Sequence, residues 1–280
     1  MHRIDHLIDI ALAEDIGAGD ITTDATVEPT LSGRGVVVAR QRLVLAGLQV
    51  AGRVFERVDA GLAVALLAAD GDTVDAGQQV MAVRGGLGSM LTAERTALNF
   101  LQRMSGIATH VRAYVAAVSG KRAKLVDTRK TTPGWRALEK YAVRIGGAEN
   151  HRMGLFDGIL IKDNHIAACG GIKAAVLRTR RRVHHLVRIE VETESLAQVE
   201  EALAAGADVI MLDNMTLPQI EAAVARIAGK AMVEVSGGVR KEDLPRLADT
   251  GADLISVGAL THGAVSVDLS MEISPEAVDP

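Results

Sequence analysis

Cysteine, aromatic residues and long apolar runs are all scarce in this chain of 280 residues. The single cysteine, Cys169, excludes an internal disulfide framework and a metal site built from several thiolates. Aromatic residues make up 2% of the sequence, too few for the base-stacking platforms of proteins that bind single-stranded nucleic acid. No apolar run approaches the roughly 20 residues that span a bilayer, and the N-terminus carries acids at helical spacing where a signal peptide would be apolar. We therefore expect a cytoplasmic protein that binds neither nucleic acid nor membrane.

Lysine is missing from the first 120 residues and first occurs at Lys121. This absence matters because the segment 69–83, ADGDTVDAGQQVMAV, resembles the turn-rich strands of lipoyl and biotinyl carrier domains. Such carriers attach their cofactor to a lysine at a hairpin tip. Without that lysine, this segment cannot carry a swinging arm.

Charge is distributed unevenly along the chain. The net charge is −4, yet residues 121–190 hold 16 Lys and Arg against 6 Asp and Glu, and residues 191–280 hold 5 against 16. A cationic half and an anionic half within one domain suit a polyanionic substrate held with a divalent metal. We interpret part of the positive charge, at Arg178 and 180–182, as a solvated helix face.

Short apolar runs alternate with helical segments after about residue 120. The runs begin at residues 124, 158, 186, 208, 231 and 253, and the helical segment 195–208 has Ser195 as N-cap and Gly206 as stop signal. Repeated βα units of this length predict parallel strands. An open doubly wound sheet would give the same alternation. Candidate ligands at the ends of all six runs favour a β/α barrel, which keeps its chemistry at that edge. These ends carry Asp127, Lys162 with Asp163, Glu192, Asp213, Ser236 and Gly258.

The first 110 or so residues follow a different pattern. They contain an amphipathic opening helix, short strands at 33–40, 42–47, 62–70 and 78–85, and a long helix from about Ser89 through Arg103. This order indicates a separate α+β unit. We expect an N-terminal domain of residues 1–110 and a barrel domain of residues 111–280.

Two glycine loops follow the last two predicted strands, at Ser236-Gly237-Gly238 and Val257-Gly258-Ala259. Backbone N–H groups freed beside a helix N-terminus form a phosphate cradle. One Gly-Gly pair after a strand is as readily a plain turn. The two loops together favour phosphate binding.

Several motifs together resemble one family, quinolinate phosphoribosyltransferase, over nearly the whole chain. They are EDIGAGDITTDA at 14–25, LTAERTALNFLQRMSGIAT at 91–109, DTRKTTPG at 127–134, ENHR at 149–152, IKDNHI at 161–166, EVE at 190–192, IMLDN at 210–214, VSGG at 235–238 and SVGALTH at 256–262. The resemblance implies an α/β fold in which an N-terminal α/β sandwich domain precedes an incomplete, open-faced β/α barrel with fewer than eight strands.

The resemblance also implies a reaction: transfer of phosphoribosyl from phosphoribosyl pyrophosphate to quinolinate with decarboxylation, giving nicotinate mononucleotide, pyrophosphate and CO₂ in NAD biosynthesis. Quinolinate carries adjacent carboxylates, and a guanidinium fork matches a carboxylate bidentately. The catalytic residues implied are Arg129, Lys130, Lys162, Glu192 and Asp213. The substrate-binding residues implied are Arg95, Thr128, His151, Arg152, Ser236, Gly237, Gly238, Val257, Gly258, Ala259 and His262.

Acidic residues and one arginine receive further roles from the resemblance. Glu192 and Asp213 are assigned to the ribose hydroxyls and to Mg²⁺, through water or substrate; taken alone, Asp213 could equally cap the next helix. Glu190 points to the same strand face as Glu192 by the period-two alternation of a strand, and we expect it to be a supporting partner rather than a ligand. Arg95 is implied to reach the partner subunit's active site, so the protein would act as a homodimer. By itself it would be an ordinary helix-surface residue paired with Glu94.

Two other functions compete with this one. A lysine at a barrel strand end is also what a Schiff-base, aldolase-type lyase uses, so Lys162 could form an imine with a carbonyl substrate that borohydride would trap. A non-catalytic phosphate sensor is the second alternative. It would release no pyrophosphate from a mixture of both substrates with Mg²⁺.

Overall fold

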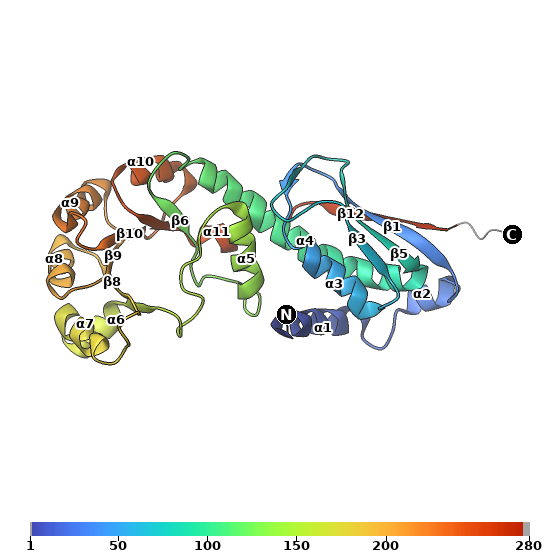
Figure 1. Ribbon diagram of the computed structural model, residues 1–280, viewed down its shortest axis with the longest axis horizontal. Coiled ribbons are helices and arrows are strands. Elements are labelled where there is room, and N and C mark those ends of the chain that lie inside the picture. The colour runs from blue at the N-terminus through green and yellow to red at the C-terminus, as the bar shows by residue number, and fades with distance from the viewer. Residues whose placement is uncertain (1, 277–280) are drawn as a thin grey trace. The chain divides into compact units, whose positions relative to one another are not determined.

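The computed structural model describes residues 2–276 (Figure 1). Its contacts divide the chain into two compact units. The first contains the chain up to His110 together with the stretch from Ala264 onward, and the second runs from Val111 to Gly263. None of the helices in the described part of the chain combines the length and apolar character needed to cross a bilayer.

The first unit is built on a four-stranded antiparallel sheet in the order β12-β1-β5-β3. Its strands are β1 (Ser32–Ala39), β3 (Ala63–Leu66), β5 (Gln79–Gly86) and β12 (Leu269–Pro275), and β2 (Leu43–Val44) pairs with β4 (Thr73–Val74) in a separate ribbon. The helices are α1 (His2–Ile16), α2 (Ile21–Thr26), α3 (Leu48–Val58) and the long α4 (Leu87–Ala116), whose residues from Val111 onward belong to the second unit. The structure confirms a strand within each of the four predicted stretches.

By its contacts the C-terminal segment belongs to the first unit, whereas the predicted barrel domain runs to residue 280. Residues 264–280 were assigned to the barrel domain, but β12 pairs with β1 over seven residue pairs, from Gly33 with Pro275 to Ala39 with Leu269. Leu269 and Val267 are buried. Strand pairing with a partner more than 200 residues away leaves no local signal in the sequence, so this return could not be predicted.

Helix α4 extends well beyond the predicted end at Arg103. Its apolar face continues through Met104, Ile107 and Val111, all fully buried. Position 106, inside the helix, is a glycine because a Cβ there would overlap the carbonyl group of Val265 and lie 3.0 Å from Cα of Ser266. This glycine serves a close backbone approach.

The second unit is a parallel six-stranded sheet in the order β6-β11-β10-β9-β8-β7. Its strands are β6 (Lys124–Val126), β7 (Ile159–Ile161), β8 (Ile189–Thr193), β9 (Val209–Asp213), β10 (Met232–Ser236) and β11 (Leu254–Ser256). Strands β7 to β11 neighbour one another in chain order, and β6 joins beside β11. A closed barrel would need one more pairing, between β6 and β7. The predicted incomplete, open-faced barrel is confirmed, because a doubly wound sheet would reverse its strand order at a switch point.

Helices connect successive strands of this barrel. They are α5 (Arg136–Gly146), α6 (Asp163–Cys169), α7 (Ile172–Arg180), α8 (Leu196–Ala204), α9 (Leu217–Ile227), the short η1 (Lys241–Asp243) and α10 (Leu244–Asp249). One further helix, α11 (Ala259–His262), follows β11, the last strand of the barrel in chain order. The Ser195 side chain accepts a hydrogen bond from the N–H of Gln198, as expected of the N-cap of α8.

The strands of this unit present two faces of different character. Val191, Ile210, Val233 and Val235 are buried, and α8 and α9 contact these strands. The alternate positions Glu190, Glu192, Met211 and Glu234 face the other way by the period-two alternation of a strand. Polar chemistry is therefore concentrated on the inner face of the barrel.

Candidate active site

A cavity of about 470 Å³ lies at the carboxyl ends of the barrel strands. Thirteen of the sixteen predicted site residues line it: Thr128, Arg129, Lys130, His151, Arg152, Lys162, Glu192, Asp213, Ser236, Gly237, Gly238, Val257 and Gly258. A larger cavity of about 860 Å³ shares His151, Arg152 and Glu234 with it. We take the smaller cavity as the site because the two lysines, both glycine loops and the strand-end carboxylates line it.

Four cations converge on this cavity. Arg129 and Lys130 follow β6, Arg152 precedes β7 and Lys162 ends it. The Arg152 Nη1 donates to the carbonyl oxygen of Gly158 at 2.9 Å. Burial, and after it the charge of Arg129, lowers the pKa of Arg152. The two guanidinium groups therefore repel one another in a partly desolvated place, which an anion between them would relieve.

Carboxylates at the next two strand ends face these cations. The Lys162 ammonium donates to Oε2 of Glu192 in a short ion pair. The Asp213 Oδ2 accepts from the amide Nδ2 of Asn214 at 2.7 Å. Asp213 does not cap the following helix, because Thr216 is the N-cap of α9 and forms a capping box there. The carboxylate of Asp213 is thus available to the cavity that it lines.

The loop after β10 is shaped by glycine. Gly237 and Gly238 have φ of 91° and 58°. A Cβ on Gly237 would lie 2.6 Å from the backbone N of Asn214, which donates to the carbonyl oxygen of Ser236 at 3.1 Å. Within the described residues, no protein acceptor takes the N–H of either glycine. Free N–H groups in such a concave turn suit an anion.

The loop after β11 approaches the cationic segment after β6. A Cβ on Gly258 would lie 2.9 Å from Cδ of Lys130 and 3.2 Å from Nε2 of His262. The Thr261 hydroxyl donates to the carbonyl oxygen of Lys130 at 2.7 Å. Ala259 and His262 belong to α11, directly behind the loop, and are not lining residues of the cavity.

Arg95 lies outside the residues that line this cavity. It is on α4 in the first unit, its side chain is 60% exposed, and its Nη2 lies 3.9 Å from Oε1 of Glu94. A separation of that size at an exposed position contributes little to stability. The Arg95 guanidinium is therefore exposed and only weakly paired.

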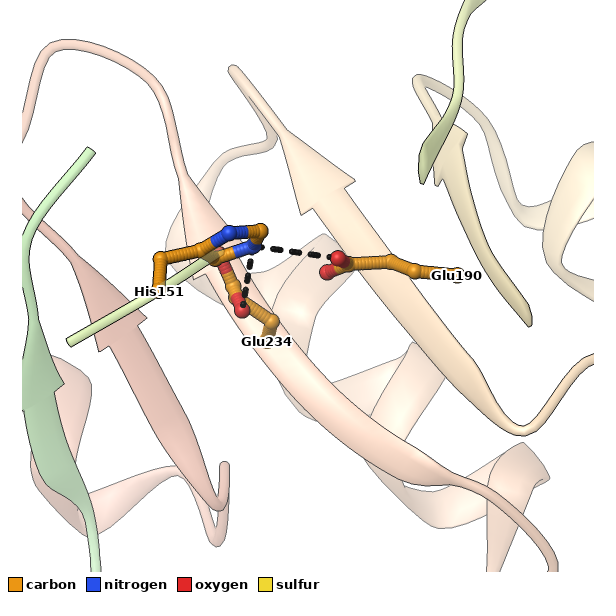
Figure 2. A group of neighbouring side chains, drawn as sticks. All are labelled: His151, Glu190 and Glu234. Atoms are coloured by element: carbon orange, nitrogen blue, oxygen red, sulfur yellow. Dashed lines mark hydrogen bonds and ion pairs between the residues drawn. The ribbon is translucent and has the colours of Figure 1, made fainter. Parts of the chain in front are cut away.

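Glu190 and Glu234 meet His151 (Figure 2), and of these three residues His151 and Glu234 line the cavity. His151 Nε2 lies 3.1 Å from Oε2 of Glu190 and 3.6 Å from Oε2 of Glu234. Glu190 therefore contacts this histidine, and its supporting role in the site stays a prediction. Glu234 was missed, although MVEVS around it repeats the pattern of IEVET around Glu190: an acid in the middle of an apolar strand.

Both carboxyl groups of this cluster are buried, with Glu190 6% and Glu234 1% exposed. Their Oε1 atoms are buried without a hydrogen-bond partner. Burial, reinforced by the charge of Glu190, raises the pKa of Glu234 to about 8. Glu234 therefore holds a proton near neutral pH.

The hydrogen bonds of His151 define its protonation. The backbone N–H of Arg152 donates to Nδ1 at 2.8 Å, so Nδ1 is an acceptor and the ring hydrogen lies on Nε2, facing the two carboxyl groups. Burial alone would lower the pKa of His151, and the hydrogen bond with Glu190, together with the charge of that carboxylate, raises it above its usual value. A second proton would enter at Nδ1 and break the bond from Arg152.

The same bonds bear on metal binding. One ligand-type atom from each of His151, Glu190 and Glu234 lies within 4.8 Å of the others. A histidine nitrogen that binds a metal must carry no hydrogen. Since Nδ1 already accepts a hydrogen bond, Nε2 is a donor, and the cluster is better suited to hold a proton than a metal.

Comparison with known proteins gives two family matches. The model described as "Quinolinate phosphoribosyl transferase, N-terminal domain" matches residues 20–105, and the corresponding C-terminal domain model matches residues 107–272. A "Probable nicotinate-nucleotide pyrophosphorylase [carboxylating]" from Bacillus subtilis is 42% identical, over 97% of this chain and 94% of the relative. The enzyme of that name from Mycobacterium leprae is 44% identical, over 94% of each chain.

Solved structures agree with the sequence relatives. The crystal structure of NadC from Streptococcus pyogenes has a TM-score of 0.95 and 44% identity, covering 99% of this chain and 98% of that one. The nicotinate-nucleotide pyrophosphorylase from Francisella tularensis has a TM-score of 0.93 and 40% identity, covering 98% and 96%. This chain therefore belongs to the quinolinate phosphoribosyl transferase family.

Proposed function

We propose that this protein transfers the phosphoribosyl group of phosphoribosyl pyrophosphate to quinolinate and removes one carboxylate as CO₂, giving nicotinate mononucleotide and pyrophosphate in NAD biosynthesis. One observation carries the proposal. Four cations line one cavity together with two strand-end carboxylates and two glycine loops. Two highly charged anions could share such a cavity, because fixed cations offset their repulsion and desolvation.

Quinolinate is the substrate proposed for the cations Arg129, Arg152 and Lys162. A planar dicarboxylate needs donors arranged as forks, and a guanidinium provides one. Burial, and after it the charge of Arg129, lowers the pKa of Arg152. An anion bound between the two arginines would stabilise the charged form of both. His151 belongs to the wall, where its two nitrogens are bonded to the protein.

Phosphoribosyl pyrophosphate is proposed to bind between the glycine loops and the strand-end acids. Gly237, Gly238 and Gly258 offer backbone N–H groups that no described residue accepts. Lys130 lies against the last of these glycines and would act as a point charge near the pyrophosphate. Glu192 and Asp213 would accept hydrogen bonds from the ribose hydroxyls. His262, beside Gly258, would contact a phosphate oxygen.

Mg²⁺ is the metal proposed to accompany the pyrophosphate. The metal usually binds through one or two protein carboxylates together with water and substrate phosphates. Glu192 and Asp213, on adjacent strands and both lining the cavity, fit this donor set. When bound, the ion would offset the charge of the leaving pyrophosphate.

The reaction then needs mainly positioning and electrostatics. The bond from C1 of the ribose to the pyrophosphate oxygen breaks, and its electron pair leaves with pyrophosphate. The pyridine nitrogen forms the new bond to C1 from the opposite face. The resulting pyridinium accepts the electron pair of the C2–carboxylate bond as CO₂ departs, and C2 takes up a proton. No covalent enzyme intermediate is required.

We also propose that the working form is a homodimer with shared sites. Arg95 is exposed on α4, and the cavity itself is lined by residues of the second unit alone. An arginine from a second copy would supply a further cation to a site that binds two polyanions.

The aldolase-type alternative has no support in this geometry. A Schiff-base lysine reacts as a free amine. The Lys162 nitrogen instead donates to the Glu192 carboxylate, the arrangement of an ammonium ion. Such a lyase would also leave the two glycine loops without a role.

The direct test is an assay of nicotinate mononucleotide and pyrophosphate formation from quinolinate, phosphoribosyl pyrophosphate and Mg²⁺. We expect product with the unaltered protein and almost none with Arg129→Ala. Release of neither product by the unaltered protein would exclude the proposed reaction and favour the sensor alternative.

A further inference from the structure

Asp127 and Lys140 form an ion pair inside the second unit, and both side chains are 0% exposed. Asp127 directly follows β6, Lys140 is on α5, and neither lines the cavity of about 470 Å³. Taking two charges out of water costs several kcal/mol for each ion, and well-packed apolar residues are often at least as stabilising. Stability alone therefore does not explain this pair.

The contacts of the pair converge on the backbone of His151. Asp127 Oδ1 accepts the N–H of His151 at 2.9 Å, and Lys140 Nζ donates to the carbonyl oxygen of His151 at 2.9 Å. Asn150 Nδ2 completes the network by donating to Asp127 Oδ2 at 2.6 Å and to the carbonyl oxygen of Lys140 at 2.9 Å. The pair thus holds the N–H and the C=O of a single residue.

Side chains hold this part of the backbone because it has no helix or strand of its own. Between the end of α5 at Gly146 and the start of β7 at Ile159 there is no helix or strand, apart from one bridge of Glu149 with Val126. The backbone of this segment therefore lacks the regular hydrogen bonds that fix the backbones of α5 and β7.

The fixed backbone of His151 leads directly to Arg152. The Arg152 N–H donates to Nδ1 of His151 at 2.8 Å, and the imidazole is held at its other end by Glu190 at 3.1 Å. The Arg152 guanidinium lines the cavity and bonds to Gly158 at 2.9 Å. Its place is therefore determined by the segment that the buried pair secures.

Arg152 needs such a hold because Arg129 repels it. Arg129 comes two residues after Asp127, whose backbone N–H donates to the carbonyl oxygen of Glu149 at 3.2 Å. Asp127 therefore ties together the two segments that carry these arginines. Without it, two like charges in a partly desolvated cavity would move apart before the substrate binds.

We infer that the buried Asp127–Lys140 pair is a positioning device that aims Arg152 at the quinolinate carboxylates. The inference rests on the proposed function. Neither residue lines the cavity, so both act through the His151–Arg152 backbone.

The test is a double-mutant cycle of Lys140→Met, Asp127→Asn and the combined variant, each measured for kcat and for the KM of both substrates. We expect each single variant to raise the quinolinate KM between about tenfold and about a hundredfold, the size expected for a misplaced binding group. The KM for phosphoribosyl pyrophosphate should change less than about twofold, since the pair does not contact the glycine loops. The combined variant should be no worse than the poorer single one, because its members act as a unit.

A matched control is the exposed ion pair of Lys124, on β6, with Glu149. Its Nζ and Oε1 atoms lie 2.6 Å apart. Lys124→Met with Glu149→Gln should leave both KM values unchanged. Asn150→Ala removes two bonds of the network while keeping both buried charges, and it provides the same comparison if either single variant fails to fold.

An unchanged quinolinate KM in folded variants would overturn the inference. So would an equal loss of kcat and of affinity for both substrates together with a lower Tm, because that is the result of a purely structural role. Arg152→Ala is the separate arm for the proposed function. If that variant keeps the normal quinolinate KM, the assignment of Arg152 to quinolinate is wrong, whatever the pair does.

Discussion

Nε2 of His151, a residue that lines the cavity, lies 3.1 Å from Oε2 of Glu190, and this contact joins the irregular segment before β7 to strand β8. The other ring nitrogen, Nδ1, accepts from the backbone of Arg152. Both nitrogens are thus bonded within the protein. The family resemblance assigned His151 to substrate binding, and this geometry favours a role in holding the arginine next to it.

Arg129→Lys tests whether fork geometry matters in addition to charge. Lysine keeps the positive charge but cannot bind a carboxylate bidentately. We expect the quinolinate KM to rise at least about tenfold, the loss of one strong charge-assisted contact. Steady-state kinetics with both substrates measure this. Arg178→Lys, at an exposed position of α7, is the control and should behave as the unaltered protein. An unchanged quinolinate KM in Arg129→Lys would show that charge alone suffices.

Mixing two inactive variants tests the shared site. If Arg95 serves the neighbouring subunit, Arg95→Ala and Arg129→Ala are each inactive alone. Random reassociation makes half the dimers mixed, and each mixed dimer regains one intact site of two. We therefore expect about a quarter of normal activity after mixing. No recovery in mixtures shown to contain mixed dimers would contradict the sharing of sites.

Glu234→Gln tests the buried proton through stability. Glutamate has an ordinary pKa of 4.5, and burial followed by the Glu190 charge raises that of Glu234 to about 8 in the folded protein. Between these values the folded chain binds more protons than the unfolded chain, so the free energy of unfolding falls as pH rises from 4.5 to about 8. Gln cannot ionise, and the variant should lose this fall.

Denaturant unfolding at several pH values across that window provides the measurement. Glu221→Gln, on the exposed side of α9, is the control and should keep the pH dependence of the unaltered protein. Parallel profiles for Glu234→Gln and the unaltered protein would show that Glu234 is ionised throughout.

Gly237→Ala tests the loop after β10. Its φ of 91° and the 2.6 Å approach to the backbone N of Asn214 leave no place for a Cβ. We expect a loss of about 1–3 kcal/mol of stability and a higher KM for phosphoribosyl pyrophosphate. Gly229→Ala is the matched control, since it has φ of 75° with nothing within 4 Å. It should cost about 1 kcal/mol without affecting either KM.

Much of the fold could be predicted because its signals are local. Each βα unit is recognisable in the sequence as an apolar run followed by a helical segment. The polar residue at each strand end indicates the edge of the sheet where Lys162, Glu192 and Asp213 line the cavity. The glycine loops are local too, since a positive φ at Gly237 is a property of one residue.

Contacts between distant segments could not be predicted in this way. Glu234 sits in a strand whose pattern matches that of Glu190, but only the pairing of β8 and β10 with β9 brings the two acids together beside His151. Lysine is mostly an exposed residue, so nothing local in the sequence predicts that Lys140 is fully buried against Asp127.

The sequence by itself determined the parallel α/β barrel, the cationic strand ends and the family, because these depend on residue type and spacing along the chain. The tertiary structure alone decided that β12 returns to β1, that His151 uses both ring nitrogens within the protein, and that Asp127 and Lys140 share a buried bond. The physical reason is that strand register and the packing of irregular loops depend on partners remote in the chain, and the free energy of a buried charge depends on which partner it meets.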